Sequence, residues 1–385
     1  MRRLVLIVLV AAGGLALLAL RGTAKPAPSA YDADLADVDS RLARIARTRA
    51  SAPDDAAAAL EDVHQRYLRA SLTAGYADFR RAEATIESVM ARFGASEELL
   101  LARANLAFKL HRIAAAKRDL TRLPGTGATQ GLRADIALME GRYADASRDY
   151  DALLAAAPTW DNLARIAYLK SKTGDVAGAD RLYVQAADQL TAKELRSYAW
   201  IELQRGLLRH DNGRDAEALE HYRRAERAYS GYWLVEEHIA EALQALGRTR
   251  EAIALYRRVI ARTGNPEYAG ALAILLDRSD PDEARALYAD ADRLYAERLR
   301  IYPEAAIGHR IRFLLARPGA SPELLSLARQ NVQLRPNGEA KLLLAEAYLK
   351  SGAPAPARAV LAEVLQTPWR TPELARVQKQ IAAAH

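Results

Sequence analysis

Acidic and imidazole side chains stand close together at one place in the sequence, where Glu237, His238 and Glu241 would lie on one helix. Residues three and four apart are neighbours on a helix surface, so this trio is compatible with a metal site. A metal site also needs at least three convergent groups and hydrogen-bonded support around them, and the sequence gives no reason to expect either. We therefore predict no metal ion and no cofactor.

Other chemistry-bearing patterns are absent from the sequence or explained without catalysis. There is no Gly-x-Ser-x-Gly nucleophile turn and no His-Glu-x-x-His metal helix. The glycine-rich stretch 124–131 follows an expected helix rather than a strand and lacks the Gly-Lys-Ser/Thr ending of a phosphate loop, so we interpret it as a linker between repeats. The sequence favours a protein that is not an enzyme. A catalytic helical toroid stays as an alternative, and it would require convergent acids in a deep closed cavity.

The elements that would position these residues come from an internal repeat. A glycine, an alanine and a tyrosine recur after 34 residues, as Gly213, Ala218 and Tyr222, then Gly247, Ala252 and Tyr256. A period in the thirties with small and aromatic residues at fixed offsets is typical of stacked helix-turn-helix units. Glycine fits the turn, alanine lets two helices approach closely, and tyrosine fills the space one turn later. The sequence therefore predicts a first helix ending near Asp211 and a second helix starting near Asp215.

Looser copies of this pattern flank residues 197–262, around Tyr150, Tyr183, Tyr288 and Tyr348. The pattern resembles the tetratricopeptide repeat (TPR) family at its small-residue, turn-glycine and aromatic positions, although the family's first-helix tryptophan is not kept in step. The resemblance implies an all-α, right-handed solenoid of about eight or nine stacked helix pairs, and a protein of the exported, bacterial envelope type. The apolar half of the composition, rich in Ala and Leu, also favours an all-helical protein.

Composition excludes several other classes of protein. The chain has no cysteine, so disulfides and thiolate metal sites are excluded. The net charge of +7 is modest for 385 residues, and arginine pairs such as Arg223-Arg224 lie beside acidic residues. Mixed charge of this kind is typical of a solvated helix face, so we predict no nucleic-acid partner. No small-molecule substrate is evident.

The first residues of the sequence have the pattern of an export signal. Two arginines precede residues 4–20, which contain no charge. A helix of this length would span about 26 Å, slightly short of a bilayer core but longer than a usual signal-peptide core. We predict an N-terminal hydrophobic helix within residues 1–24 that anchors the chain to the inner membrane, with the repeats in the periplasm. Cleavage near Ala24, which would release a soluble periplasmic protein, is the alternative.

Composition and punctuation divide the rest of the chain. Residues 25–30 read as a stiff linker, 31–124 as a degenerate helical region, 125–264 as the core repeats, 265–370 as C-terminal repeats and 371–385 as a capping helix. Four helix starts carry a capping side chain, proline and an acid, at Asn265, Asp280, Ser321 and Thr371. The helix from Pro281 should be long and continue to Tyr302.

The resemblance also implies where a partner would bind. In the family, the first helix of each pair lines a concave groove, and the inward-facing positions correspond here to Asp135, Tyr168, Trp200, Leu203, Leu207, His210, Glu237, Glu241, Gln244 and Glu346. We expect these residues to bind an extended peptide or a partner helix, unless Trp200 and Leu203 simply pack against the preceding pair. The predicted function is a scaffold or adaptor for protein–protein interactions in the bacterial cell envelope. The alternative is a soluble periplasmic chaperone or maturation factor for a particular enzyme or transporter.

Overall fold

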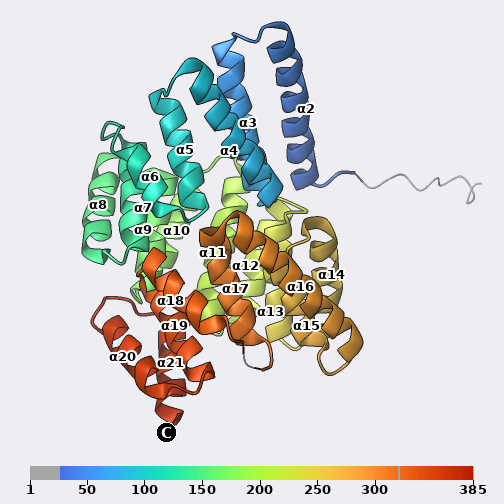
Figure 1. Cartoon of the computed structure of the whole chain (residues 1–385), viewed down its shortest axis with the longest axis vertical. Coiled ribbons are helices and arrows are strands. Elements are labelled where there is room, and N and C mark those ends of the chain that lie inside the picture. Colours follow the sequence, from blue (N-terminus) through green and yellow to red (C-terminus); the bar gives the residue numbers. More distant parts are fainter. Residues whose placement is uncertain (1–26, 320, 385) are drawn as a thin grey trace, which may run out of the picture.

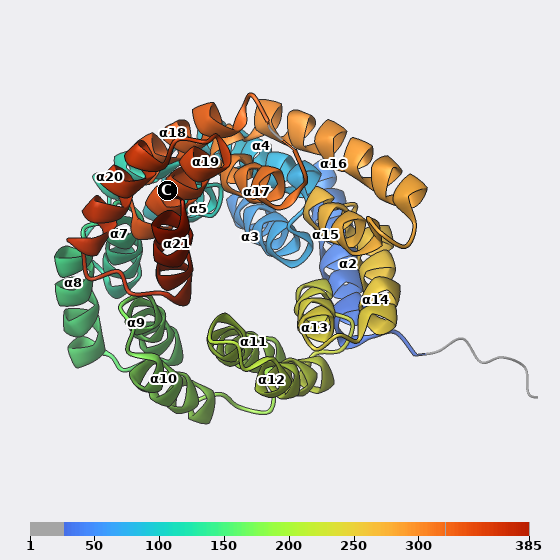
Figure 2. The ribbon, with the colours of Figure 1, turned by 90° about the horizontal axis from the view of Figure 1, so that it is seen from below.

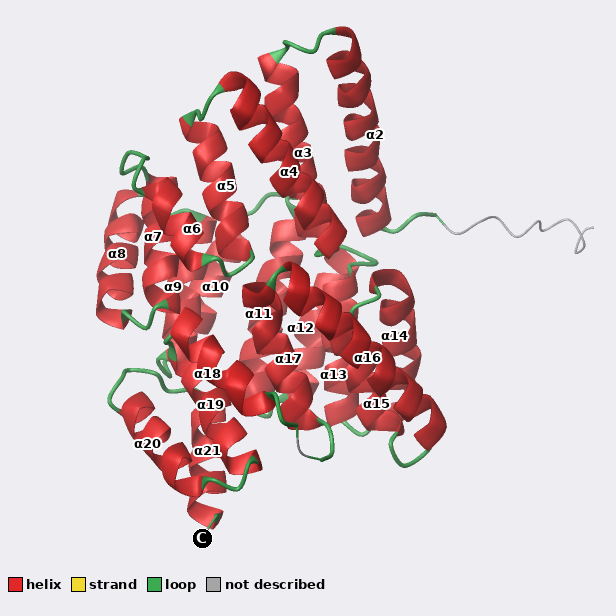
Figure 3. Ribbon diagram, in the orientation of Figure 1, coloured by secondary structure: helices red, strands yellow, loops and turns green. Residues whose placement is uncertain are grey.

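The computed structural model describes residues 27–319 and 321–384, and this part of the chain is helical, with no strand (Figure 3). It contains twenty helices. In chain order they are α2 (Ala30–Ser51), α3 (Ala56–Thr73), α4 (Tyr76–Phe93), α5 (Glu97–Lys109), α6 (Ile113–Leu120), α7 (Gly127–Met139), α8 (Tyr143–Ala156), α9 (Trp160–Lys172), α10 (Val176–Asp188), α11 (Leu195–Asp211), α12 (Asp215–Ala228), α13 (Trp233–Ala245), α14 (Thr249–Thr263), α15 (Pro266–Leu276), α16 (Pro281–Ile301), α17 (Pro303–Ala316), α18 (Leu324–Leu334), α19 (Gly338–Lys350), α20 (Pro354–Leu365) and α21 (Pro372–Ala383).

Consecutive helices pack as pairs, from α3 with α4 to α19 with α20, and each pair stacks on the next. The turn glycines adopt the left-handed conformation that only glycine reaches without strain, as at Gly213 (φ +70°) and Gly247 (φ +75°). Ala218 and Tyr222 are both fully buried where α12 crosses α11. The predicted end of the first helix at Asp211 and the predicted start of the second helix at Asp215 are confirmed.

The stacked pairs wind into a right-handed superhelix. In Figure 2, which views the molecule from below, the inner helices follow one another anticlockwise from α5 through α9 and α13 to α17. Figure 1 shows that the chain also runs downwards, and therefore towards the viewer of Figure 2. An anticlockwise path that approaches the viewer is right-handed. The first helix of each pair faces the axis, and the second lies outside it, as α9 and α10 show. The solenoid therefore has a concave wall built from first helices.

The superhelix completes a full turn, so repeats far apart in sequence meet. The backbone amide of Gly338 in α19 donates a hydrogen bond to the hydroxyl of Tyr143 in α8 at 2.7 Å. The hydroxyl of Tyr302 donates to Glu83 at 2.8 Å, which joins the end of α16 to α4. The indole of Trp233 donates to the carbonyl of Leu72 at 2.9 Å, which joins α13 to α3. Such contacts between successive turns enclose the concave wall.

At three of the four predicted positions, a side chain caps the helix that begins with the next residue, a proline. The side chains of Asn265, Asp280 and Thr371 each accept a hydrogen bond from a backbone amide of the first turn. The long helix from Pro281 ends at Ile301, next to the predicted Tyr302. The fourth prediction was wrong, because α18 begins at Leu324 and Ser321 does not cap it. Glu323 instead accepts a hydrogen bond from Arg310 at 2.9 Å.

The glycine-rich stretch 124–131 is a loop only as far as Thr126. Its later residues form the first turns of α7, where Thr126 and Thr129 make a capping box. The prediction of a linker was therefore too long, because two glycines are tolerated in a helix that a strong cap starts. The other predicted boundaries, at 264/265 and 370/371, fall in turns within one continuous stack.

The predicted hydrophobic helix within residues 1–24 lies outside the described residues, as do the first two residues of the predicted linker. Ser29 caps α2, which packs against α3. None of the described helices combines the length and apolar character that crossing a bilayer requires.

Candidate functional site

The concave wall contains a cavity of about 560 Å³ in which side chains from the middle and from the C-terminal part of the solenoid face each other. The cavity lies between α9, α11 and α13 on one side and α17, α19 and α21 on the other. Its charged and aromatic lining residues are Tyr168, Lys172, His210, Asp211, His238, Glu241, Arg312, Glu339, Trp369, Glu373 and Arg376. The full turn of the superhelix thus brings residues 168 and 376 to one site.

An apolar pocket of about 420 Å³ adjoins this cavity and shares Tyr168 with it. Trp160 and Trp200 line the pocket and pack edge to face, with ring centroids 6.5 Å apart. Asp135 also lines the pocket, where it accepts hydrogen bonds from Tyr150 at 2.7 Å and Arg165 at 3.2 Å. The concave wall is therefore aromatic on one side and charged on the other.

The charged side combines paired groups with a free ammonium. Arg312 lies 2.6 Å from Glu339 and 3.6 Å from Glu373. Burial opposes ionisation of Glu339, but the Arg312 guanidinium outweighs burial and lowers the pKa of Glu339 to about 2. The Lys172 ammonium lies 5.0 Å from the ring centroid of Tyr168, a cation–π contact, and no described carboxylate pairs with it.

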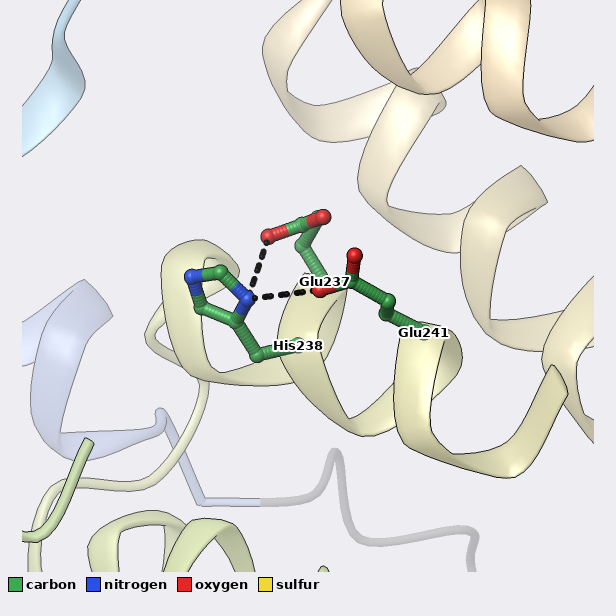
Figure 4. Close-up of side chains that lie close together, drawn as sticks. All are labelled: Glu237, His238 and Glu241. Carbon is green, nitrogen blue, oxygen red and sulfur yellow. Dashed lines mark hydrogen bonds and ion pairs between the residues drawn. The ribbon is translucent and has the colours of Figure 1, made fainter. Parts of the chain in front are cut away.

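Two histidines and two glutamates form a cluster at the cavity wall, seen in part in Figure 4. His238 Nδ1 lies 3.3 Å from Glu237 Oε2 and 3.1 Å from Glu241 Oε2. His210 of α11 lies 3.5 Å from the other oxygen of Glu241. Hydrogen bonding to Glu241 raises the pKa of His210 to about 9, so its imidazole is charged at neutral pH. Burial and the neighbouring Glu241 raise the pKa of Glu237.

The structure brings most of the predicted groove residues to the concave wall. Tyr168, Leu207, His210 and Glu241 line the cavity, and Asp135, Tyr168 and Trp200 line the apolar pocket. Glu237 lies beside the cavity, where it contacts His238. Leu203 is 1% exposed and lies in the core, so it does not reach the groove surface. Gln244 is half-buried at the end of α13, and Glu346 pairs with Arg376.

Sequence reasoning missed Lys172, Arg312, Glu339 and Glu373. Lys172 and Glu339 both lie on the first helices of their pairs, but not at the repeat positions that face the groove in the TPR family. The sequence therefore provided only a weak indication that they line the cavity. Arg312 lies on α17, whose repeat departs from the pattern, and Glu373 lies on the capping helix α21. Their meeting depends on the full turn of the superhelix, which no local pattern encodes.

Comparison with solved structures supports the fold. The chain is similar to one in the crystal structure of the APC/C hetero-tetramer Cut9–Hcn1, with a TM-score of 0.51 and 15% identity over 90% of this chain and 66% of that chain. This chain thus spans about two thirds of the length of that one. Weaker likenesses are to yeast Tom70 (TM-score 0.37, 15% identity, 92% of this chain and 96% of that chain) and to the C-terminal part of a TPR repeat-containing protein from Cytophaga hutchinsonii (TM-score 0.38, 15% identity, 68% of this chain and 99% of that chain).

No family model matches the sequence, and no curated protein matches it. At 15% identity the structural likeness concerns the fold alone. The described part of the chain is an all-helical, TPR-like solenoid.

Proposed function

We propose that the chain is a non-enzymatic scaffold that binds a segment of a partner protein against its concave wall. The observation that carries this proposal is the adjacency of an aromatic pocket and a charged cavity that share Tyr168. An amphipathic peptide or helix would place its apolar side on Trp160 and Trp200 and its charged side towards Lys172 and Arg312. Half-exposed aromatic residues beside charges are typical anchors of protein interfaces.

Tyr168 is 36% exposed although it lies within the superhelix, so its ring is available to a ligand. Most aromatic residues of the repeats, such as Tyr183 and Tyr222, are buried and serve the core. A solvent-facing aromatic ring on a first helix has no packing role of this kind. This difference supports a binding role for Tyr168.

The test is affinity capture from envelope extracts with the wild type and the double variant Tyr168→Ala, Trp200→Ala. Val184→Ala is the matched control, because Val184 has the same 36% exposure but lies on the outer helix α10. We expect the double variant to lose the specific partner and the control to keep it. Retention of every specific partner by a folded double variant would refute the proposal.

A second candidate, catalysis at the cavity, is favoured by one observation. Glu237 and Glu241 lie close together and their pKa values are displaced in opposite directions, as in acid–base pairs. Assays of ester, peptide and glycoside hydrolysis that compare the wild type with Glu241→Gln separate the two functions. Turnover by the wild type that Glu241→Gln abolishes would support catalysis.

The proposed location is the bacterial cell envelope, with residues 1–24 as an inner-membrane anchor. The support is the uncharged stretch 4–20 after two arginines. Intact-mass measurement of the membrane fraction tests it. The full mass in that fraction supports an anchored protein, and a mass that lacks the first 24 residues supports a cleaved, soluble periplasmic factor.

A further inference from the structure

The strongest unassigned feature of the molecule is the group of ligand atoms on α13 at the cavity wall. One oxygen each of Glu237 and Glu241 and one ring nitrogen of His238 all lie within 4.8 Å of one another. We propose that Glu237, His238 and Glu241 bind one divalent transition-metal ion of the zinc type. This inference does not depend on the proposed function.

The spacing of the three atoms fits such an ion. Zinc lies about 2.0–2.2 Å from nitrogen and oxygen ligands, so the ligands of a tetrahedral site lie about 3.3–3.6 Å apart. His238 Nδ1 lies 3.3 Å from Glu237 Oε2 and 3.1 Å from Glu241 Oε2. In Figure 4 the carboxylates of Glu237 and Glu241 both approach the same ring nitrogen of His238.

A second layer of contacts supports the ligands, as metal sites require. Asp215 Oδ1 lies 2.6 Å from His210 Nδ1 and holds that ring in place. His210 Nε2 lies 3.5 Å from Glu241 Oε1, the oxygen that does not face His238. His210 and Asp215 are therefore positioning residues, because they orient the Glu241 carboxylate and leave its second oxygen for the ion.

The hydroxyl of Tyr222 points independently to a missing ligand. The ring of Tyr222 is fully buried and stacks on His238, with centroids 5.6 Å apart and an angle of 24°. Its hydroxyl is buried without a hydrogen-bond partner among the described residues. A water on the metal ion would give the hydroxyl a partner.

The donor set selects the class of metal. One imidazole nitrogen with two carboxylate oxygens suits zinc and similar transition metals, whereas magnesium prefers oxygen ligands in an octahedral shell and keeps several waters. His238 and Glu241 both line the cavity of about 560 Å³. The remaining coordination position therefore faces the cavity, where water or a ligand side chain would occupy it.

Zinc titration of the full-length protein after chelator treatment tests the inference, with a zinc-binding dye as competitor and Mg²⁺ as the comparison ion. We expect one Zn²⁺ per chain and no competition by Mg²⁺ at equal concentration. Glu241→Gln and His238→Gln should each weaken zinc binding at least about tenfold, and Asp215→Asn about 10- to 100-fold. Co²⁺ bound to the wild type should give the visible absorption spectrum of a tetrahedral, four-coordinate site.

His309→Gln is the matched control, because His309 forms a comparable pair with Glu267 at 3.1 Å but no third ligand lies beside it among the described residues. This variant should bind zinc as the wild type does. Glu241→Gln keeps the shape of the side chain, and its far-UV spectrum shows whether it folds, so the test survives if His238→Gln unfolds the protein. Equal zinc affinity of folded Glu241→Gln and the wild type, or no stoichiometric zinc in the wild type, would overturn the inference.

Discussion

The backbone amide of Gly338 at the start of α19 donates a hydrogen bond of 2.7 Å to the phenol oxygen of Tyr143 at the start of α8. The ring of Tyr143 also packs against Trp369, with centroids 5.9 Å apart. A side chain on Gly338 has no room, since a Cβ there would lie 2.3 Å from the Trp369 ring. These contacts join repeats 195 residues apart and bring α19 and α21 to the cavity.

Tyr143→Phe removes this hydrogen bond and leaves the buried amide of Gly338 without its partner. We expect a loss of about 1–3 kcal/mol in the free energy of unfolding and faster hydrogen exchange at the start of α19. Tyr348→Phe is the control, because among the described residues the Tyr348 hydroxyl accepts a hydrogen bond only from Arg329 on the adjacent helix. Unchanged exchange in α19 of Tyr143→Phe would show that this contact does not hold the turns together.

Gly206→Ala tests the close approach of α11 and α12. A Cβ on Gly206 would lie 2.2 Å from Cε1 of the buried Tyr222 ring. We expect destabilisation of roughly 1–3 kcal/mol, although alanine is the better helix former by about 1 kcal/mol. Urea denaturation measures the change. Gly127→Ala, at a position with open space, should be neutral or stabilising, and equal effects of the two variants would contradict this account.

Acid should remove a stabilising contribution of Glu202, which is buried in α11. Burial opposes its ionisation, but hydrogen bonds from His221 at 2.9 Å and Arg224 at 2.7 Å outweigh burial and lower its pKa to about 2. Its usual pKa in an unfolded chain is about 4.3. The contribution, roughly 3 kcal/mol, is therefore complete above that value and is lost as the pH falls towards 2.

Glu202→Gln should flatten this acid dependence and lower stability at neutral pH, because it leaves Arg224 without its charged partner. Urea denaturation at several pH values measures both effects. Glu251→Gln, which removes an exposed pair with Arg248, should keep the acid dependence. An acid profile of Glu202→Gln identical to that of the wild type would exclude this residue as the cause.

Leu203 and Leu207 are a matched pair on α11 that separates core from groove. Leu203 is 1% exposed, and Leu207 lines the cavity. Leu203→Ala should cost about 2–5 kcal/mol of stability and leave partner affinity unchanged in the folded protein. Leu207→Ala should cost less stability but weaken partner binding. If instead Leu203→Ala weakened partner binding and Leu207→Ala did not, the groove would lie on another face of α11.

The repeat itself was readable from the sequence, because its determinants are local. Left-handed glycines, small crossing residues and buried tyrosines recur at Gly213, Ala218 and Tyr222, and each acts within one helix pair. The cavity was not readable. The meeting of Tyr168 with Arg312 and Glu339 depends on small rotations accumulated over several repeats, and the sequence pattern does not report that sum.

The cluster at Glu237 shows the same limit. The trio is visible as neighbours on one helix, but its support by His210 and Asp215 comes from the adjacent pair, α11 and α12. Leu203 is the opposite case. Its position in the repeat predicted a groove residue, but its side chain lies in the core.

Photo-crosslinking from single positions tests the central claim of binding at the concave wall most directly. A photoreactive phenylalanine analogue at Tyr168 faces the cavity, and the same analogue at Val184 lies on outer helix α10 with equal exposure. We predict that the captured partner crosslinks to position 168 and not to position 184. Crosslinks from position 184 with none from position 168 would contradict the account.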